Sequence, residues 1–121
     1  MAHILLVEDN PATSRTIQAM LEGLGHTVAT AGDGAQGLRQ LNQAPGFDLV
    51  LTDIMMPVLD GISLIVQIHK HHPMVPVIAM TARTDSNYLR NAERLGAWAT
   101  LAKPFTIEEL AEQVQGVHPG A

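Results

Sequence analysis

Polar residues that can bind a metal ion or take part in group transfer follow four short apolar runs of this 121-residue sequence. They are Glu8 and Asp9, Asp53, Thr81, and Lys103 with Pro104. If the four runs are neighbouring strands, three carboxylates meet at one edge of a sheet and repel one another, and a bound divalent cation would relieve that repulsion. Oxygen ligands without histidine or cysteine favour Mg²⁺, with Mn²⁺ as an alternative ion.

Phosphoryl transfer is the chemistry that suits this set of residues. Its transition state needs alignment and positive charge near the equatorial phosphoryl oxygens, which Mg²⁺ and Lys103 would supply while Thr81 donates a hydrogen bond. Asp53 is the natural nucleophile, because a carboxylate can attack phosphorus and form an acyl phosphate. Each residue taken alone is as well explained as a helix cap or a surface charge. Only their joint occurrence after four apolar runs is informative.

The apolar runs predict the strands that position these residues. The predicted strands are residues 4–7, 27–31, 48–52, 75–80 and 97–102, and several are apolar at successive positions, as strands covered on both faces are. Amphipathic stretches between them predict helices from Asn10-Pro11 to Gly25, over 33–43, 61–71 and 85–95, and from about residue 106 onward. This alternation predicts an α/β fold with a doubly wound, five-stranded parallel sheet and five helices on both faces.

Length and composition limit what the protein can be. The chain is long enough for one domain, which we place at residues 1–116, with 117–121 as a short frayed tail. A net charge of −5 disfavours direct binding to nucleic acid. The apolar runs are too short to cross a membrane, and the N-terminus lacks a signal-peptide pattern. With no cysteine in the chain, we expect a cytoplasmic protein.

Five motifs make the chain resemble response-regulator receiver domains of two-component signalling, the family of the chemotaxis regulators with a flavodoxin-like fold. The motifs are ILLVEDN (4–10), DLVLTDIMMPVLDG (48–61), PVIAMTA (76–82), LGA (95–97) and LAKPF (101–105). The spacing from the Asp53 block to Lys-Pro-Phe is highly specific. The resemblance covers residues 4 to about 114 and implies the strand order 2-1-3-4-5.

The resemblance also implies a role for each site residue. Asp53 would be the phosphoacceptor, and Glu8, Asp9, Asp53 and the backbone carbonyl of Met55 would hold Mg²⁺. Thr81 would be the switch hydroxyl, and Lys103 would contact the phosphoryl group. Pro57 and Gly61 would shape the loop after Asp53, and Pro104 would fix the turn after Lys103 through a cis bond.

Four positions differ from the usual family pattern or vary within it. Thr100 stands where receivers commonly carry an aromatic switch residue, and Trp98 lies two residues earlier. We expect Trp98 to pack in the core rather than to act as an exposed interface anchor. Met55 and Arg83 occupy the variable positions, two residues beyond Asp53 and Thr81, that tune phosphoryl lifetime in this family.

A short histidine-rich stretch, His69, His71 and His72, invites interpretation as a metal site. We favour a structural interpretation, because histidines near a helix C-terminus complement the helix dipole and Pro73 ends the helix there.

The predicted function is a signalling switch phosphorylated by a histidine kinase or a histidine phosphotransfer protein. Its output would pass to a downstream protein through the face formed by the fourth helix, the last strand and the last helix. It would not be an enzyme beyond phosphorylation and dephosphorylation of its own Asp53. A phosphatase would need a second acid, where Met55 stands. A pseudo-receiver that binds partners without phosphorylation is a competing hypothesis, as is a flavin or nucleotide carrier on the same architecture.

Overall fold

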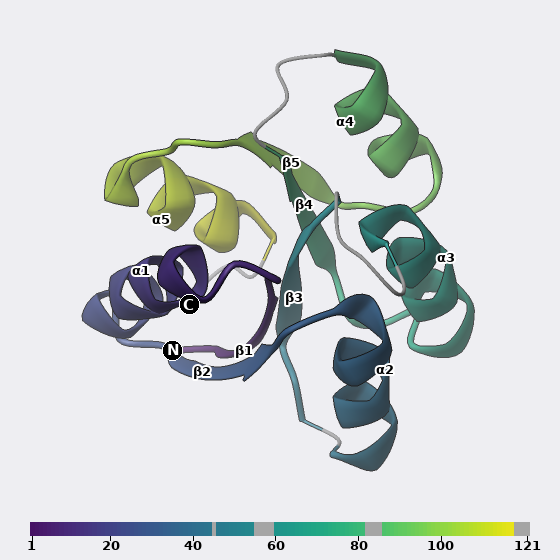
Figure 1. The fold of residues 1–121 in the computed structure, drawn as a ribbon, viewed down its shortest axis with the longest axis horizontal. Helices are drawn as coiled ribbons and strands as arrows, with labels where there is room; N and C mark the ends of the chain where they lie inside the picture. Colours follow the sequence, from purple (N-terminus) through teal and green to yellow (C-terminus); the bar gives the residue numbers. More distant parts are fainter. Residues whose placement is uncertain (45, 55–59, 82–85, 118–121) are drawn as a thin grey trace.

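The computed structural model of the chain describes residues 1–44, 46–54, 60–81 and 86–117, and in the last segment it describes side chains from residue 90 onward. Strands and helices alternate along the chain (Figure 1). The elements are β1 (His3–Val7), α1 (Pro11–Gly23), β2 (Thr27–Ala31), α2 (Gly34–Gln43), β3 (Leu49–Asp53), α3 (Gly61–His71), β4 (Val77–Thr81), α4 (Ser86–Arg94), β5 (Ala99–Ala102) and α5 (Ile107–Val117).

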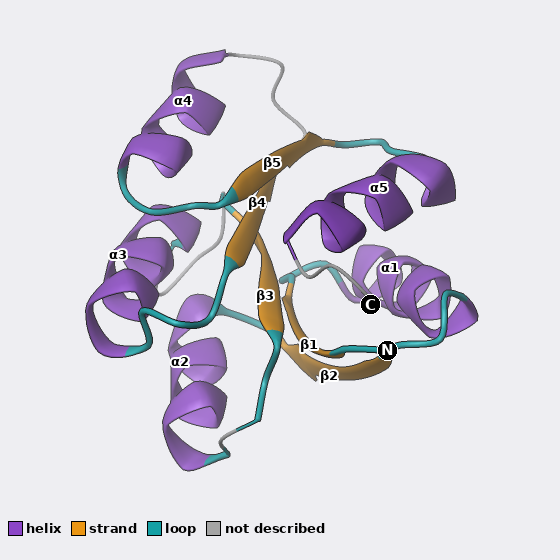
Figure 2. Cartoon of the chain, turned by 180° about the vertical axis from the view of Figure 1, so that it is seen from behind, coloured by secondary structure: helices purple, strands orange, loops and turns teal. Residues whose placement is uncertain are grey.

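The five strands form one parallel sheet in the order β2-β1-β3-β4-β5. Helices α1 and α5 cover one face, and α2, α3 and α4 cover the other (Figures 1 and 2). The predicted fold class and the strand order implied by the resemblance are therefore confirmed. Within the described residues, no helix combines the length and apolar character needed to cross a bilayer.

Polar side chains start three of the helices where the sequence predicts it. The side-chain oxygen Oδ1 of Asn10 accepts a hydrogen bond from the Thr13 N–H at 3.0 Å, directly before Pro11. Asp33 and Asp60 cap α2 and α3 in the same way, each at 2.8 Å from the backbone nitrogen three residues on. These caps satisfy N–H groups that the first helical turn leaves without a partner.

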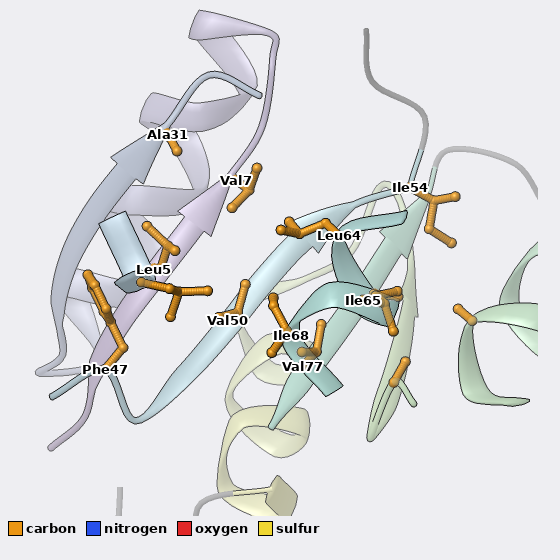
Figure 3. Packing of buried hydrophobic residues seen from close by; sticks show 14 residues of the cluster. Leu5, Val7, Ala31, Phe47, Val50, Ile54, Leu64, Ile65, Ile68 and Val77 are labelled. Carbon is orange, nitrogen blue, oxygen red and sulfur yellow. The ribbon is translucent and has the colours of Figure 1, made fainter. Parts of the chain in front are cut away.

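Two layers of apolar side chains hold the helices to the sheet. Successive strand residues enter opposite layers, as the pleat of a strand requires. Leu5 and Val50 pack toward α2 and α3 (Figure 3), whereas Leu6 and Leu51 pack toward α1 and α5. The central strands β3 and β4 are buried at every residue, which explains why their sequences are apolar at successive positions.

β2 spans the predicted residues 27–31, and the other strands differ from prediction by one or two residues at an end. β4 begins at Val77 rather than at 75, since Pro76 has no N–H to donate to the sheet. β5 begins at Ala99 rather than at 97, because the Ala97 N–H bonds back to the Ala92 carbonyl at the end of α4. α5 continues to Val117, one residue past the predicted domain boundary at 116, and residues 118–121 lie outside the described part.

The prediction that Trp98 packs in the core is wrong. Trp98 is 68% exposed, although its backbone N–H donates to the Val77 carbonyl at 2.8 Å beside the start of β5. The backbone is therefore tied to the sheet while the indole lies on the surface. An edge strand has one neighbour only, so a large side chain next to it finds less cover than one next to a central strand.

Candidate functional site

The carboxyl ends of β1, β3, β4 and β5 bring the predicted site residues to one edge of the sheet. Register places Val7 opposite Thr52, and Asp53 opposite Met80. Glu8 and Asp9 follow β1 directly, and Asp53 is the last residue of β3. One carboxylate oxygen from each of these three residues lies within 4.8 Å of the others. The carboxylate cluster predicted from the sequence is therefore present in the fold.

Lys103 joins two of these carboxylates across long distances in the chain. Its Nζ donates to Glu8 Oε1 at 2.6 Å and to Asp53 Oδ2 at 2.8 Å. The side chains of Glu8, Asp53 and Lys103 are 1%, 8% and 16% exposed, so the ion pairs are shielded from water. Shielding strengthens the attraction between the charges, but it also removes the hydration that each charge would otherwise have.

The electrostatic environment raises the pKa of both Glu8 and Lys103, for different reasons. Burial raises the pKa of Glu8, and the nearby Asp53 carboxylate adds to the rise, against hydrogen bonds from Lys103 and the Asn10 N–H that lower it. Burial alone would lower the pKa of Lys103, but its hydrogen bonds to Asp53 and Glu8, together with the negative charges of these two carboxylates, outweigh burial and raise it. Lys103 therefore stays positively charged, whereas Glu8 holds its negative charge at an energetic cost.

The donor set fits a hard divalent cation. All three ligand side chains offer oxygen, and Asp9 is exposed while Glu8 and Asp53 are buried. A cation held here would face the solvent on the Asp9 side and keep part of its water shell, as Mg²⁺ does in proteins. The cost of ionising the buried Glu8 would also fall beside a second positive charge.

Two further predicted residues, Thr81 and Pro104, lie at the same end of the sheet. Thr81, fully buried at the end of β4, accepts the Lys103 N–H on its carbonyl at 2.8 Å, and the Lys103-Pro104 bond is cis as expected. Thr100 is half-buried on β5. Met55, Pro57 and Arg83 lie outside the described residues.

Gly61 approaches the site more closely than the sequence suggests. It is the first residue of α3, and its N–H donates to the Ile54 carbonyl at 2.9 Å. A Cβ atom placed on Gly61 would lie 2.1 Å from the Asp53 carbonyl oxygen and 2.6 Å from the Ile54 Cα. No side chain fits there, so glycine allows the start of α3 to pack on the end of β3.

Comparison with known proteins agrees with this geometry. A family model described as the response regulator receiver domain matches residues 4–115. The chain belongs to this family. As a receiver domain it is similar to the DNA-binding transcriptional regulator NtrC of Escherichia coli, with 38% identity over 93% of this chain, although it spans only 24% of the length of that regulator.

Solved receiver domains share the whole fold. A receiver domain protein from Clostridium thermocellum superposes with a TM-score of 0.91 at 31% identity, over 97% of this chain and 94% of that one. The receiver domain of the Pseudomonas aeruginosa sensor histidine kinase PA1611 superposes with a TM-score of 0.87 at 38% identity, over 95% of both chains. That structure has a magnesium ion coordinated in its active-site cleft.

Sequence reasoning missed one residue beside the phosphoacceptor candidate of this receiver domain. Thr52 is fully buried in β3, and its Oγ1 donates to the Asp53 carbonyl at 2.9 Å. The only signal in the sequence was a single hydroxyl at the end of the apolar run 49–51, directly before Asp53. A buried hydroxyl is tolerated only where it has a hydrogen-bond partner, and the partner of this one is the backbone of Asp53.

Proposed function

We propose that this receiver domain is a phosphoacceptor switch of a two-component or phosphorelay system, and that Asp53 receives the phosphoryl group from a histidine kinase or a histidine phosphotransfer protein. The observation that carries the proposal is the Lys103 ammonium, held 2.8 Å from Asp53 Oδ2 beside a cluster of three carboxylates. A cation so close to the acceptor oxygens can offset the charge of the transferring group.

The transfer is a substitution at phosphorus. A carboxylate oxygen of Asp53 forms the new oxygen–phosphorus bond, and the bond from phosphorus to the donor breaks with its electron pair leaving on the donor. Lys103 contacts the phosphoryl oxygens, and the Thr81 hydroxyl donates to them. The domain acts only on its own Asp53, so it is a switch and not an enzyme for external substrates.

Glu8, Asp9 and Asp53 are the residues that would hold Mg²⁺, with the backbone carbonyl of Met55 as a further ligand from the family pattern. When bound, Mg²⁺ supplies positive charge that offsets the crowded carboxylates and the phosphoryl oxygens. The magnesium ion in the PA1611 receiver supports the choice of ion. Mn²⁺ is the alternative ion that the same oxygen donors would accept.

Output passes to a downstream protein through the α4-β5-α5 face, in a cytoplasmic setting and without direct contact to nucleic acid. Thr100 is too small to follow a hydroxyl movement at Thr81 as an aromatic residue would, so we place the phosphorylation response mainly between Thr81 and Tyr88. Amide exchange with and without a phosphoryl mimic tests this placement. An equally large change along Ala97–Leu101 and in α5 would contradict it.

Intact mass spectrometry tests the proposed function. The protein is incubated with acetyl phosphate and Mg²⁺, and we expect one added phosphoryl group that requires the metal. Asp53→Asn should take up none, whereas the matched control Asp33→Asn should react normally, since asparagine also caps a helix. Replacing Mg²⁺ by Mn²⁺ tests the alternative ion. An unmodified wild-type protein, or equal modification of Asp53→Asn, would falsify the proposal.

A further inference from the structure

The Thr52 side chain lies on the face of β3 opposite to the Asp53 carboxylate and Lys103. Val50 and Ile54, two residues before and after Thr52, both pack in the apolar layer under α2 and α3 (Figure 3). Because side chains alternate along a strand, Thr52 belongs to that same face. Asp53 points to the other face, where its carboxylate meets Lys103. Thr52 therefore cannot touch the phosphoryl group directly.

The peptide group between Asp53 and Ile54 is held from three directions. Its carbonyl oxygen accepts the hydrogen bond from Thr52 Oγ1 at 2.9 Å. Its N–H donates to the Met80 carbonyl of the neighbouring strand β4 at 3.0 Å. On the side of α3, Gly61 comes so close that a Cβ atom would lie 2.1 Å from the same carbonyl oxygen. Two hydrogen bonds and the close approach of Gly61 thus restrict the orientation of this peptide group.

Fixing this peptide group also fixes the acceptor side chain. Rotation about the Asp53 N–Cα bond, the φ angle, turns the Asp53 Cβ and the carbonyl carbon together, so a carbonyl group held in place also fixes the direction of the side chain. The preceding residues of β3 are anchored by pairing with β1 and β4, so at the strand end this rotation is limited by the contacts of the Asp53–Ile54 peptide group. The hydroxyl of Thr52 restrains that rotation from inside the core.

Packing alone does not explain a threonine at this position. The site is fully buried in a strand of aliphatic residues, where valine would have nearly the same shape and no polar atom to satisfy. We infer that Thr52 is a positioning residue, whose hydroxyl holds the Asp53 peptide group so that the carboxylate lies within reach of Lys103 and the donor phosphorus. This inference rests on the proposed phosphorylation of Asp53.

The inference predicts a loss of rate that loss of stability does not explain. Displacement of a reacting group by 1 Å can cost about 100-fold in rate, and a partial loosening of one peptide group should cost about tenfold. Thr52→Val should therefore lower the rate constant for phosphorylation at saturating acetyl phosphate and Mg²⁺ by about tenfold. Thr52→Ser restores the hydroxyl and should stay close to the wild-type rate.

Thr27→Val is the matched control. The Oγ1 of Thr27 also donates to a backbone carbonyl, that of Ala2 at 3.5 Å, but at the opposite end of the strands, where Thr27 pairs with His3. The substitution removes the same chemical group without touching the Asp53 peptide, so it should keep the wild-type phosphorylation rate. All variants are assayed well below their unfolding temperatures, so that a difference in stability does not enter the rate.

A second measurement does not depend on phosphorylation. Loss of the Thr52 hydroxyl should speed hydrogen exchange of the Ile54 N–H, which belongs to the loosened peptide group, relative to the Leu51 N–H earlier in β3. Slow phosphorylation of Thr52→Val, rescue by Thr52→Ser and faster Ile54 exchange together support the inference.

Three outcomes would overturn it or the function on which it rests. A folded Thr52→Val protein with the wild-type rate, or equal losses in Thr52→Val and Thr52→Ser, shows that the hydroxyl does not position Asp53. If the wild-type protein takes up no phosphoryl group, the proposed function fails, and the exchange ratio then decides separately whether Thr52 restrains this peptide.

Discussion

Gly61→Ala is the substitution for which the structure predicts the sharpest effect. The added Cβ would meet the Asp53 carbonyl oxygen at 2.1 Å and the Ile54 Cα at 2.6 Å, whereas ordinary contact begins at 3.4 Å. The first turn of α3 and the end of β3 must therefore separate by about 1.3 Å. Both atoms belong to the backbone, so no side-chain rotation can relieve the clash.

The size of the effect follows from what must move. Overpacking that shifts backbone costs about 1–3 kcal/mol, and a contact this short belongs at the upper end, so we expect Gly61→Ala to lower the free energy of unfolding by about 3 kcal/mol. Since the displaced atom is the carbonyl of the acceptor residue itself, phosphorylation by acetyl phosphate should slow by about 100-fold as well.

Two other glycines provide graded controls. A Cβ on Gly23, at the end of α1, would meet nothing within 4 Å, so Gly23→Ala should raise the free energy of unfolding by about 0.5 kcal/mol through helix propensity. A Cβ on Gly37 would meet Val7 Cγ2 at 2.9 Å, a side-chain atom, so Gly37→Ala should cost about 1 kcal/mol.

Urea unfolding of the three alanine variants and their rates of phosphorylation measure these effects. The expected order of stability is Gly23→Ala, wild type, Gly37→Ala and Gly61→Ala, and only Gly61→Ala should react slowly. If Gly61→Ala unfolds at the wild-type urea concentration and is phosphorylated at the wild-type rate, α3 does not start against the Asp53 carbonyl and the reasoning is refuted.

Three further predictions concern the charges of the site. Lys103→Met leaves two buried carboxylates side by side, so the metal-free protein should lose about 3–5 kcal/mol of stability at pH 7. Burial already raises the pKa of Glu8, so the folded variant should bind a proton at a pH where the unfolded chain does not; stability should therefore recover as the pH falls through that raised pKa, and urea unfolding at pH 7 and pH 5 shows whether it does. A Lys103→Met protein as stable as the wild type at pH 7 would contradict the ion-pair argument. Asp9→Ala removes an exposed member of the cluster, so it should weaken Mg²⁺ binding about tenfold while changing the free energy of unfolding by less than about 0.5 kcal/mol. Calorimetric titration with Mg²⁺ measures this, and wild-type affinity combined with lost stability would make Asp9 a structural residue. A protonated Glu8 cannot bind the ion, and its pKa is raised. In the wild type, the Mg²⁺ affinity measured by the same titration should therefore start to fall, as the pH is lowered, at a higher pH than it would if Glu8 were an exposed glutamate.

The sequence alone predicted the parts of this protein that depend on local patterns. Runs that are apolar at successive positions indicated buried parallel strands, and β3 and β4 are buried throughout. Asn10 and Pro11 marked the start of α1. The carboxyl ends of parallel strands share one edge of a sheet, so the residue types after each strand were enough to predict a carboxylate cluster with a lysine. The strand order came from the resemblance of the motifs.

Only the tertiary structure decided which groups touch. The sequence predicted Lys103 and Glu8, 95 positions apart, at the same edge of the sheet, but it did not indicate which carboxylates the lysine would touch or that it meets Glu8 at 2.6 Å. Trp98 is a large apolar residue of the kind expected in a core, but its place beside an edge strand leaves the indole exposed. The Thr52 hydroxyl and the missing Cβ of Gly61 acquire a meaning only when β3 and α3 are packed together. Exposure and contact depend on partners distant in the chain, which periodicity and propensity do not encode.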